Sequence, residues 1–275
     1  MGTLLLVATP IGNLGDLSTR AADALRNATL ICCEDTRRTG KLLSYLGIKG
    51  VPMAITNEHT EHQRIADVLG LLDGGGTVVV VSDAGTPGIS DPGERLVTAA
   101  IAGGHTVSAI PGPVAAVMGL VISGLPGARH VFEGFLPRRG SERAARLAEA
   151  ASERRTVVLY EAPHRLERTL ADLVAVAGAE RRVALARELT KVHEDVWRGT
   201  LGESVEHVQR VAPIGEYVIV LEGAPSPEAA TDDQVTEALR TAIEGGASKK
   251  SAIASVAIAL GVPKNRVYDA AVRLS

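Results

Sequence analysis

Cysteine is scarce in this chain of 275 residues, which contains only Cys32 and Cys33. The two are adjacent and lie inside an apolar run. Adjacent cysteines fit neither a disulfide framework nor a set of metal ligands. We therefore interpret both as reduced core residues of a cytoplasmic protein.

Long hydrophobic runs are also absent. No window approaches the roughly 20 apolar residues that a membrane-spanning helix needs, and the chain does not open on a basic region followed by an apolar stretch and a cleavage site. We therefore expect no membrane association and a cytoplasmic location. The hydrophobic content of 45% still allows a large core, and the length is compatible with two domains.

Neither sign of charge is in large excess, since the formal net charge is −3. This excludes a general electrostatic attraction to nucleic acid or membranes, so any such binding must use local basic patches. A single basic pair usually belongs to a solvated helix end, but several pairs qualify: Arg37–Arg38, Arg138–Arg139 with Arg143 and Arg146, Arg154–Arg155, and Lys249–Lys250.

Common enzyme signatures are missing. The chain contains no GxxxxGK[ST] phosphate loop, no GxGxxG after a strand and no GxSxG elbow, which argues against a kinase, an ordinary dinucleotide-binding domain and an α/β-hydrolase. The segment His59-Thr60-Glu61-His62 resembles a metalloprotease motif, but its spacing is wrong and no third ligand follows nearby. We expect no metal site.

The most informative stretch is TVVVVSDAGTPGISDPG, residues 77–93. Its β-branched start, Thr77–Val81, suits a strand buried on both faces of a parallel sheet. The loop that follows has about ten turn-forming or polar residues, more than a simple turn needs, and we expect Asp91 to cap the next helix with Pro92 as its first residue. Such a loop is the usual ligand position in an open α/β sheet.

Strands alternate with helical patterns through the first part of the chain. The predicted strands are 3–8, 30–33, 51–54, 77–81 and 105–110, and this alternation predicts right-handed crossovers and one mostly parallel sheet. Polar residues follow the strands and should converge on one edge.

After Pro111-Gly112-Pro113 the pattern changes to a small apolar helix at 114–123 and then to relatively more strands. The predicted strands are 131–135, 156–160, 182–186, 194–197 and 217–221, with helices at 140–152 and 164–177. We predict an α/β protein with an N-terminal α/β domain at 1–112, a second α/β domain with a mixed sheet at 113–223, and, after a linker at 224–231, a small helical region at 232–275. A ligand cleft is expected between the first two domains.

The polar segments, taken in order, closely resemble the tetrapyrrole methylase superfamily, and within it the 2′-O-ribose methyltransferases of bacterial small-subunit rRNA. They are VATPIGNLGDLS, CEDTRRTGKLL, NEH, VVSDAGTPGISDPG, PGPVAA, FEGFLPR, YEAPHRL and ARELTKVHE. The resemblance runs over residues 3–222. It implies two α/β domains around a deep cleft for S-adenosylmethionine, usually in a homodimer, and 2′-O-methylation of a cytidine ribose in the decoding region of 16S rRNA in the small ribosomal subunit.

The resemblance also implies which residues bind the cofactor. The expected contacts are Thr9, Pro10, Ile11, Asp83, Ala84, Gly85, Thr86, Ile89, Val114 and Ala115 from the first domain, and Tyr160, Ala162, Arg187 and Gly215 from the second. A carboxylate such as Asp83 suits an ammonium group, and backbone N–H groups of glycine-rich turns suit a carboxylate. Tight helix-sheet packing would explain Ala115 equally well.

For RNA, the same comparison indicates residues around the mouth of the cleft: Arg37, Arg38, Glu58, His59, Arg138, Arg139, His164 and Arg165. Because only 3% of the residues are aromatic, arginine planes and phosphate contacts would carry more of the recognition. The helical region has a basic face formed by Lys249, Lys250, Lys264 and Arg266, which either helps docking on a ribosomal subunit or is simply a solvated surface.

Methyl transfer to a hydroxyl requires removal of a proton, and the candidate bases are Glu161, Asp91, His164 and Glu188. We favour Glu161 or His164 as the catalytic residue because the wall of the second domain should face the substrate. Two other functions stay open. The first is a small-molecule, tetrapyrrole-type methyltransferase, but the EDTRRT and YEAPHR segments argue against it. The second is a non-catalytic ribosome-binding protein, but the intact SDAGTPGISDPG loop argues against it.

Overall fold

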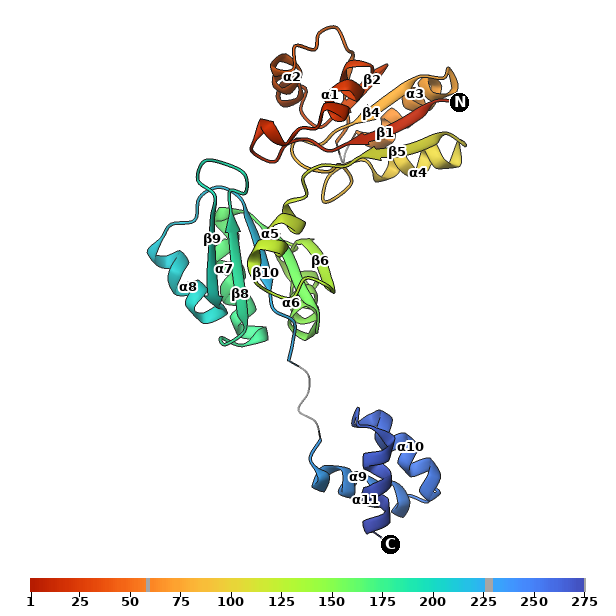
Figure 1. Ribbon diagram of the computed structural model, residues 1–275, viewed down its shortest axis with the longest axis vertical. Helices are drawn as coiled ribbons and strands as arrows, with labels where there is room; N and C mark the ends of the chain where they lie inside the picture. Colours follow the sequence, from red (N-terminus) through yellow and green to blue (C-terminus); the bar gives the residue numbers. More distant parts are fainter. Residues whose placement is uncertain (58–59, 226–229, 275) are drawn as a thin grey trace. The chain divides into compact units, whose positions relative to one another are not determined.

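The computed structural model describes residues 1–57, 60–225 and 230–274, and it divides into two compact units, Met1–Ala224 and Pro225–Ser275 (Figure 1). Glu58 and His59, which were expected to bind RNA, lie outside the described residues. Unit 1 contains two five-stranded sheets and unit 2 is helical. The predicted α/β class is therefore confirmed, whereas the exact domain boundaries, including the division of unit 1 at residue 112, stay predictions.

The first sheet is entirely parallel, and the sequence predicted a mostly parallel one. Its order is β3-β2-β4-β1-β5, formed by β1 (Thr3–Val7), β2 (Leu30–Cys33), β3 (Met53–Ile55), β4 (Thr77–Val80) and β5 (Thr106–Ile110). Helices α1 (Thr19–Arg26) and α2 (Thr36–Tyr45) pack on one face, and α3 (Glu61–Asp73) and α4 (Glu94–Ala102) on the other. Because side chains alternate along a strand, Cys33 joins the first core and Cys32 the second, and both are buried and free.

The predicted start of α4 is wrong. Asp91 and Pro92 stay in the loop, and Gly93, at φ 138°, precedes the first helical residue, Glu94. The N–H of Gly88 donates to the Pro92 carbonyl at 3.2 Å, which closes the loop on itself and delays the helix. Gly93 tolerates this backbone angle because it has no Cβ. The Asp91 side chain is thus released from the capping role that the sequence suggested.

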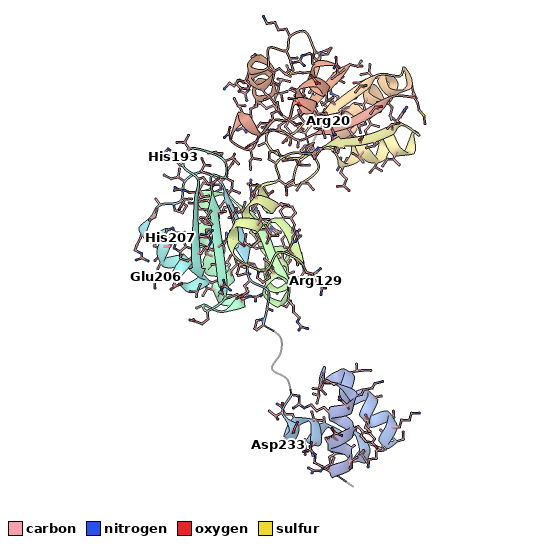
Figure 2. The ribbon with its side chains drawn as sticks, in the orientation of Figure 1. Arg20, Arg129, His193, Glu206, His207 and Asp233 are labelled. Carbon is pink, nitrogen blue, oxygen red and sulfur yellow. The ribbon has the colours of Figure 1, made fainter. Side chains whose placement is uncertain are left out.

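The second sheet is mixed. Its order is β6-β7-β10-β8-β9, formed by β6 (His130–Phe135), β7 (Thr156–Glu161), β8 (Arg182–Arg187), β9 (Asp195–Thr200) and β10 (Tyr217–Leu221), and only β6 and β7 pair in parallel. One face is covered by α6 (Gly140–Ser152), α7 (Pro163–Ala177) and α8 (Leu201–Arg210). Helix α8 was not expected from the sequence; a capping box at Thr200 and Glu203 starts it. Figure 2 labels His207 on this helix. The His207 ring stacks on Trp197 with ring centroids 5.1 Å apart.

Helix α5 (Ala115–Ser123) covers the other face of the second sheet. It follows β5 directly, so it is the segment that leads from the first sheet to the second. Gly119 allows the close approach: a Cβ at this position would lie 2.7 Å from Cγ1 of Val218 on β10.

Unit 2 is helical, as predicted for residues 232–275. Helices α9 (Asp232–Glu244), α10 (Lys249–Ala259) and α11 (Lys264–Arg273) share a core that includes Val235, Leu239 and Val267. Arg266 of the predicted basic face pairs with Asp232 at 2.8 Å, so part of that basic charge is neutralised within the unit. No helix in the part of the chain that the structure describes has the length and apolarity needed to cross a membrane.

Two helical glycines provide a matched test of this packing. The Gly119→Ala variant should lower Tm by several degrees, because overpacking against the stiff Val218 side chain costs about 1–3 kcal/mol. The Gly40→Ala variant should raise Tm slightly, because a Cβ at Gly40 on α2 meets nothing within 4 Å and alanine favours a helix by about 0.5–1 kcal/mol over glycine. Differential scanning calorimetry measures both, and equal shifts for the two variants would contradict the packing role of Gly119.

Candidate active site

The loops that follow β1 and β4 are joined by a pair of backbone hydrogen bonds. Thr9 N–H donates to the Gly85 carbonyl at 2.8 Å, and Gly85 N–H donates to the Thr9 carbonyl at 3.0 Å. Gly85 has φ +85°, and a Cβ there would lie 3.3 Å from Ile11 Cγ2. Only glycine fits this backbone easily, so the central loop approaches the first loop at the sheet edge where ligands usually bind.

The central loop also contacts the segments that lead to and form the second sheet. The Thr86 hydroxyl donates to the Pro113 carbonyl at 3.1 Å. Ser90, a non-glycine residue at φ 61°, has its hydroxyl oxygen 3.0 Å from where a Cβ of Gly134 on β6 would stand. A positive φ at a residue other than glycine costs energy and is common at functional sites. The loop is therefore fixed on two sides.

A cavity of about 360 Å³ opens between these loops and the second sheet within unit 1. Most of the expected cofactor-binding residues line it: Ile11, Asp83, Ala84, Gly85, Thr86, Ile89, Val114, Ala115, Tyr160 and Ala162. Its size lies within the range of small-molecule sites. The structure thus brings together residues that are as much as 151 positions apart, from Ile11 to Ala162.

Other lining residues were not singled out as cofactor contacts from the sequence. They are Arg38, Ser90, Asp91, Phe135, Glu161, Pro163, Ala186, Leu189, Glu216, Tyr217 and Val218. Ala186 and Leu189 could have been predicted from the sequence, because they lie within two positions of the expected contact Arg187. Phe135 could not, since an aromatic residue at a strand end carries no signal of its own.

Aromatic side chains form one wall of this cavity. Tyr160 contacts Phe132 and Phe135, with ring centroids 5.0 and 5.5 Å apart respectively. The Tyr160 hydroxyl accepts a hydrogen bond from Ala116 N–H at 3.0 Å, at the start of α5. Burial raises the pKa of the Tyr160 phenol. The Tyr160 and Phe135 rings, which both line the cavity, are tilted by 58° to each other, so this apolar wall can meet an aromatic ligand group with a ring face or a ring edge.

Carboxylates also line the cavity, among them Asp83 and Asp91. Asp83 Oδ2 lies 3.5 Å from Arg38 Nε, whereas Asp83 Oδ1 is buried with no hydrogen-bond partner among the described residues. The Asp83 N–H donates to Glu34 Oε1 at 3.0 Å. Burial, with a further contribution from the neighbouring Glu34 carboxylate, raises the pKa of Asp91 to about 7. The unpartnered Asp83 oxygen is suited to a cationic ligand group.

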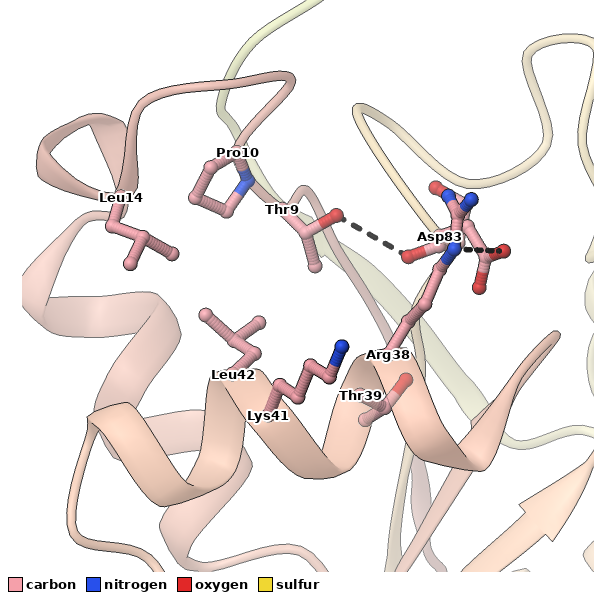
Figure 3. A pocket seen from close by; sticks show the side chains of 9 residues that line it. Thr9, Pro10, Leu14, Arg38, Thr39, Lys41, Leu42 and Asp83 are labelled. Carbon is pink, nitrogen blue, oxygen red and sulfur yellow. Dashed lines mark hydrogen bonds and ion pairs between the residues drawn. The ribbon is translucent and has the colours of Figure 1, made fainter.

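A smaller cavity of about 200 Å³ adjoins the first (Figure 3). Thr9 and Pro10, which were expected to bind the cofactor, line this smaller cavity instead of the larger one. Arg38 and Asp83 line both, so their ion pair stands at the boundary between them.

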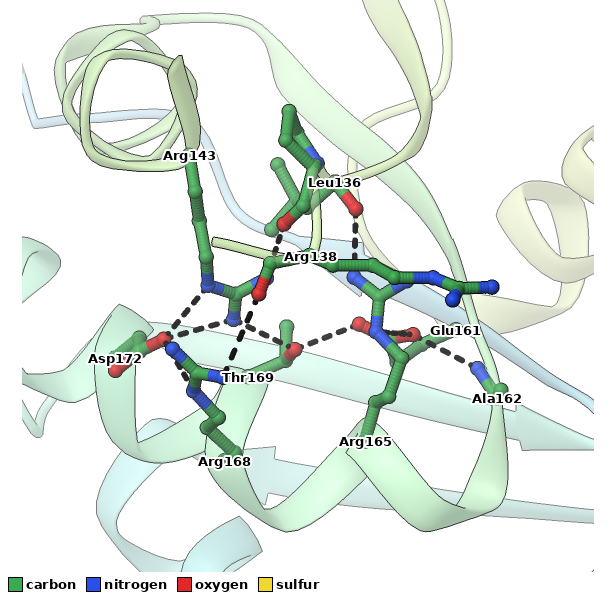
Figure 4. A network of polar contacts seen from close by, with 10 residues as sticks. Leu136, Arg138, Arg143, Glu161, Ala162, Arg165, Arg168, Thr169 and Asp172 are labelled. Carbon is green, nitrogen blue, oxygen red and sulfur yellow. Dashed lines mark hydrogen bonds and ion pairs between the residues drawn. The ribbon is translucent and has the colours of Figure 1, made fainter. Parts of the chain in front are cut away.

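Glu161, a favoured catalytic base, is enclosed in a polar network (Figure 4). Its side chain is 0% exposed and lies 3.2 Å from Arg165 Nε. It also accepts hydrogen bonds from the Thr169 hydroxyl at 2.6 Å and from Ala162 N–H at 2.9 Å. Both carboxylate oxygens therefore have partners within the protein.

The network continues to the loop after β6. The Arg165 guanidinium donates to the Leu136 carbonyl at 2.6 Å. Arg143 of α6, only 4% exposed, donates to the Pro137 carbonyl at 3.0 Å, to Thr169 and to Asp172. The Glu161 network thus fixes the loop that presents Arg138 and Arg139.

The remaining expected cofactor residues, Arg187 and Gly215, do not line either cavity. Gly215 has φ +84°, and a Cβ there would lie 2.4 Å from the Glu188 carboxyl carbon. Glu188 itself accepts a hydrogen bond from Lys191 Nζ at 2.7 Å. Both Glu188 and Thr190 adopt positive φ angles, and Asn13 N–H donates to the Thr190 hydroxyl at 3.1 Å. This strained loop therefore holds the first and second sheets together beside the cavity.

The expected RNA-binding residues occupy different environments. Arg37 is 87% exposed and pairs with Asp35 at 2.8 Å, which keeps the pKa of that carboxyl at about 2. His164, Arg138 and Arg139 lie toward the surface, whereas Arg165 belongs to the Glu161 network. The described residues contain no group of three or more His, Cys, Asp or Glu side chains that could hold a metal ion.

The raised pKa of Asp91 predicts a pH dependence of stability. The folded protein keeps a proton on Asp91 up to about pH 7, whereas the unfolded chain releases it near its ordinary value of 3.8. Wild type should therefore lose stability as pH rises through this window, and the Asp91→Asn variant should not share that loss. We expect the Tm advantage of the variant to widen by a few degrees between about pH 4 and 7 and to stay constant above this range, because the shift changes the free energy of unfolding by roughly 1–2 kcal/mol for this half-buried group. Parallel Tm curves for the two proteins would contradict this assignment.

Comparison with known proteins gives the family. The family model of Tetrapyrrole (Corrin/Porphyrin) Methylases matches residues 3–204. A protein of Synechocystis sp. named "Ribosomal RNA small subunit methyltransferase I" is 43% identical over 277 residues, with 100% of this chain and 99% of the relative covered. A relative of the same name from Mycobacterium tuberculosis is 45% identical, with 98% and 94% covered.

Solved structures share the fold at lower identity. The methyltransferase CobJ superposes with a TM-score of 0.62 at 19% identity, covering 84% of this chain and 98% of that one. The uroporphyrin-III C-methyltransferase of Thermus thermophilus, solved with S-adenosyl homocysteine, has a TM-score of 0.56 at 15% identity, covering 81% and 97%. The chain therefore belongs to the tetrapyrrole methylase family, and within it to the group of proteins named ribosomal RNA small subunit methyltransferase I.

Proposed function

We propose that this chain uses S-adenosylmethionine to methylate small-subunit rRNA, and that the methyl group goes to the ribose 2′-oxygen of a cytidine in the decoding region of 16S rRNA. The observation that carries the proposal is the nearly full-length identity of 43–45% to relatives named ribosomal RNA small subunit methyltransferase I. The arrangement of charged and aromatic groups in the larger cavity supports it.

The larger cavity fits the cofactor chemically. The cofactor carries a sulfonium and an ammonium, and the unpartnered Asp83 Oδ1, with Asp91 nearby, would balance positive charge. The Tyr160 and Phe135 rings would lie against the adenine, while Gly85 and Ala115 leave room for close backbone approach. When bound, S-adenosylmethionine supplies an electrophilic methyl group. We propose the lining residues named above for this role, with Thr9, Pro10, Arg187 and Gly215 acting through the loops that shape the cavity.

Among the candidate bases, Asp91 is the one we now favour. The Glu161 carboxylate has partners for both oxygens and no exposed surface, and Glu188 is engaged by Lys191. Asp91 lines the cavity, and its pKa of about 7 is close to the value at which proton acceptance is most effective near neutral pH. In this role an Asp91 carboxylate oxygen takes the proton of the acceptor hydroxyl. His164, which is exposed, would then contact RNA.

The substrate side of the proposal uses basic residues near the cavities. Arg38 lines both cavities, and Arg138 and Arg139 are held by the Glu161 network. Phosphate contacts of this kind position a nucleic acid without reading its sequence. Holding acceptor and methyl donor in line would supply most of the rate enhancement, on the order of 7–11 kcal/mol.

We further propose that the protein acts as a homodimer in the cytoplasm. Support comes from α5, on which Val117 and Val121 are 47% and 67% exposed. Apolar side chains that cluster on one exposed helix face are typical of surfaces covered by a partner.

The Asp83→Asn variant should bind S-adenosylmethionine about tenfold or more weakly, because a charge-assisted hydrogen bond to the ammonium contributes roughly 1.5–3 kcal/mol. Isothermal titration calorimetry measures this affinity. The Asp67→Asn variant, which changes a carboxylate paired with Arg64 on the surface, is the matched control and should bind normally. Equal affinity of both variants for the cofactor would contradict the role of Asp83.

Transfer of labelled methyl from S-adenosylmethionine to unmodified small ribosomal subunits tests the function itself. After alkaline digestion the label should remain in a dinucleotide, because a methylated 2′-oxygen cannot attack the neighbouring phosphate. Label released in mononucleotides would indicate base methylation instead. If neither subunits nor free rRNA accept label while the cofactor binds, the rRNA proposal is wrong.

A further inference from the structure

The smaller cavity has a chemistry of its own. It lies between the loop after β1 and the face of α2, and is lined by Thr9, Pro10, Leu14, Arg38, Thr39, Lys41, Leu42, Ser82 and Asp83. In Figure 3 the side chains of Lys41 and Leu42 rise from α2 toward the loop that carries Pro10 and Leu14. One part of its wall is therefore apolar and another is cationic.

Its positive charge is available to a ligand. The ion pairs formed among the described residues do not include Lys41, and the pair between Arg38 and Asp83 is long, at 3.5 Å. Arg38 and Lys41 are three positions apart on α2, so they project from the same side of the helix. Arg38 and Asp83 line both cavities, whereas Lys41 lines only the smaller one and Asp91 only the larger one. The smaller cavity therefore has two basic side chains and one carboxylate, and the larger cavity has more carboxylates than basic side chains.

We propose that the smaller cavity is a nucleotide subsite, which takes a phosphate and the attached base or ribose of the residue next to the target in the RNA strand. This rests on the proposed function. Arg38 and Lys41 hold the phosphate, as basic side chains do in most protein–nucleic acid contacts, and Pro10, Leu14 and Leu42 cover the apolar face of the nucleoside. With few aromatic residues in the chain, such an aliphatic slot replaces a stacking platform.

The position of the cavity gives the subsite its purpose. Arg38 and Asp83 contribute to both cavities, so a strand seated in the smaller one continues directly to the boundary of the larger one. Binding of the neighbouring nucleotide fixes the position and orientation of the target ribose in the larger cavity. A misplacement of the acceptor oxygen by about 1 Å can reduce the rate about a hundredfold. A subsite next to the larger cavity therefore determines which hydroxyl is methylated.

Two variants test the subsite by different means. Lys41→Ala removes the cation at an exposed helix position, and Leu14→Trp fills the cavity from a residue that is 43% exposed. Lys49→Ala is the control, because Lys49 is an exposed lysine just beyond α2 that does not line the cavity. Binding of a labelled single-stranded oligoribonucleotide is followed by fluorescence anisotropy across salt concentrations, and cofactor affinity by calorimetry.

The Lys41→Ala variant should bind RNA about three- to tenfold more weakly and reduce the salt slope by about 1, as expected for loss of one phosphate contact. The Leu14→Trp variant should raise KM for small subunits at least about tenfold, as loss of one complementary contact does. Both variants should keep wild-type affinity for S-adenosylmethionine, and Lys49→Ala should match wild type throughout.

The outcomes separate this inference from the proposed function. RNA binding and KM that are unchanged in both variants would overturn the subsite and leave the function standing. RNA binding that depends on Lys41, without methyl transfer to any RNA by wild type, would overturn the function and support the subsite. If both variants lose cofactor affinity in step with RNA affinity, the cavity belongs to the cofactor and the subsite is wrong. If inorganic phosphate displaces the oligonucleotide at equal phosphate concentration, the cavity is only a general anion site, which also overturns the inference.

Discussion

Two backbone hydrogen bonds between Thr9 and Gly85 are the contact on which the candidate site depends. Because β1 and β4 are parallel neighbours, their carboxyl ends meet at one edge, but nothing in the sheet itself decides where the loops beyond them go. The hydrogen bonds between Thr9 and Gly85 fix the path of the two loops by joining them. Thr9 lines the smaller cavity and Gly85 lines the larger one. Gly85 can make this pair because its φ of +85° is open to glycine.

The second sheet must then be held at a fixed position against these loops. Helix α5 starts directly after the Pro111–Pro113 turn and packs on the second sheet where Gly119 leaves room. Beside the cavity, Asn13 N–H contacts Thr190 at 3.1 Å, and the loop of Thr190 adopts backbone angles that are costly for residues other than glycine. Backbone contacts and small residues therefore set the shape of the cavity.

Much of the fold could be predicted from the sequence. The β-branched run at Thr77–Val81 and the alternation of strands and helices led to the parallel sheet, because buried strands and crossover helices leave strong hydrophobic patterns. The predicted start of α4 was wrong. Asp91-Pro92 is a good local capping signal, but the hydrogen bond between Gly88 and Pro92 and the backbone angle of Gly93 keep these residues in the loop. Helix α8 was missed because its capping box immediately follows a strand with no turn between them.

The candidate site could be predicted in part. Ile11, Asp83 and Tyr160 were expected near the cofactor and do line one cavity, since each follows or ends a strand at the sheet edges. The engagement of Glu161 was not predicted, although its partners Arg165 and Thr169 lie on the helix that follows it. No local pattern shows that these two side chains point toward the end of β7. Likewise, no local pattern separates the surroundings of Thr9 from those of Ile11, although they line different cavities.

The Glu161 network bears on how mutational data for this protein should be interpreted. Removing one partner of a buried, hydrogen-bonded ion pair typically costs about 3–5 kcal/mol, and Glu161, Arg165 and Arg143 all support the loop at Leu136–Arg139. An alanine scan that records activity alone would therefore rank Glu161 among the residues that carry the chemistry. If the fraction of folded protein were measured for each variant as well, the same loss of activity would be attributed to unfolding of this loop.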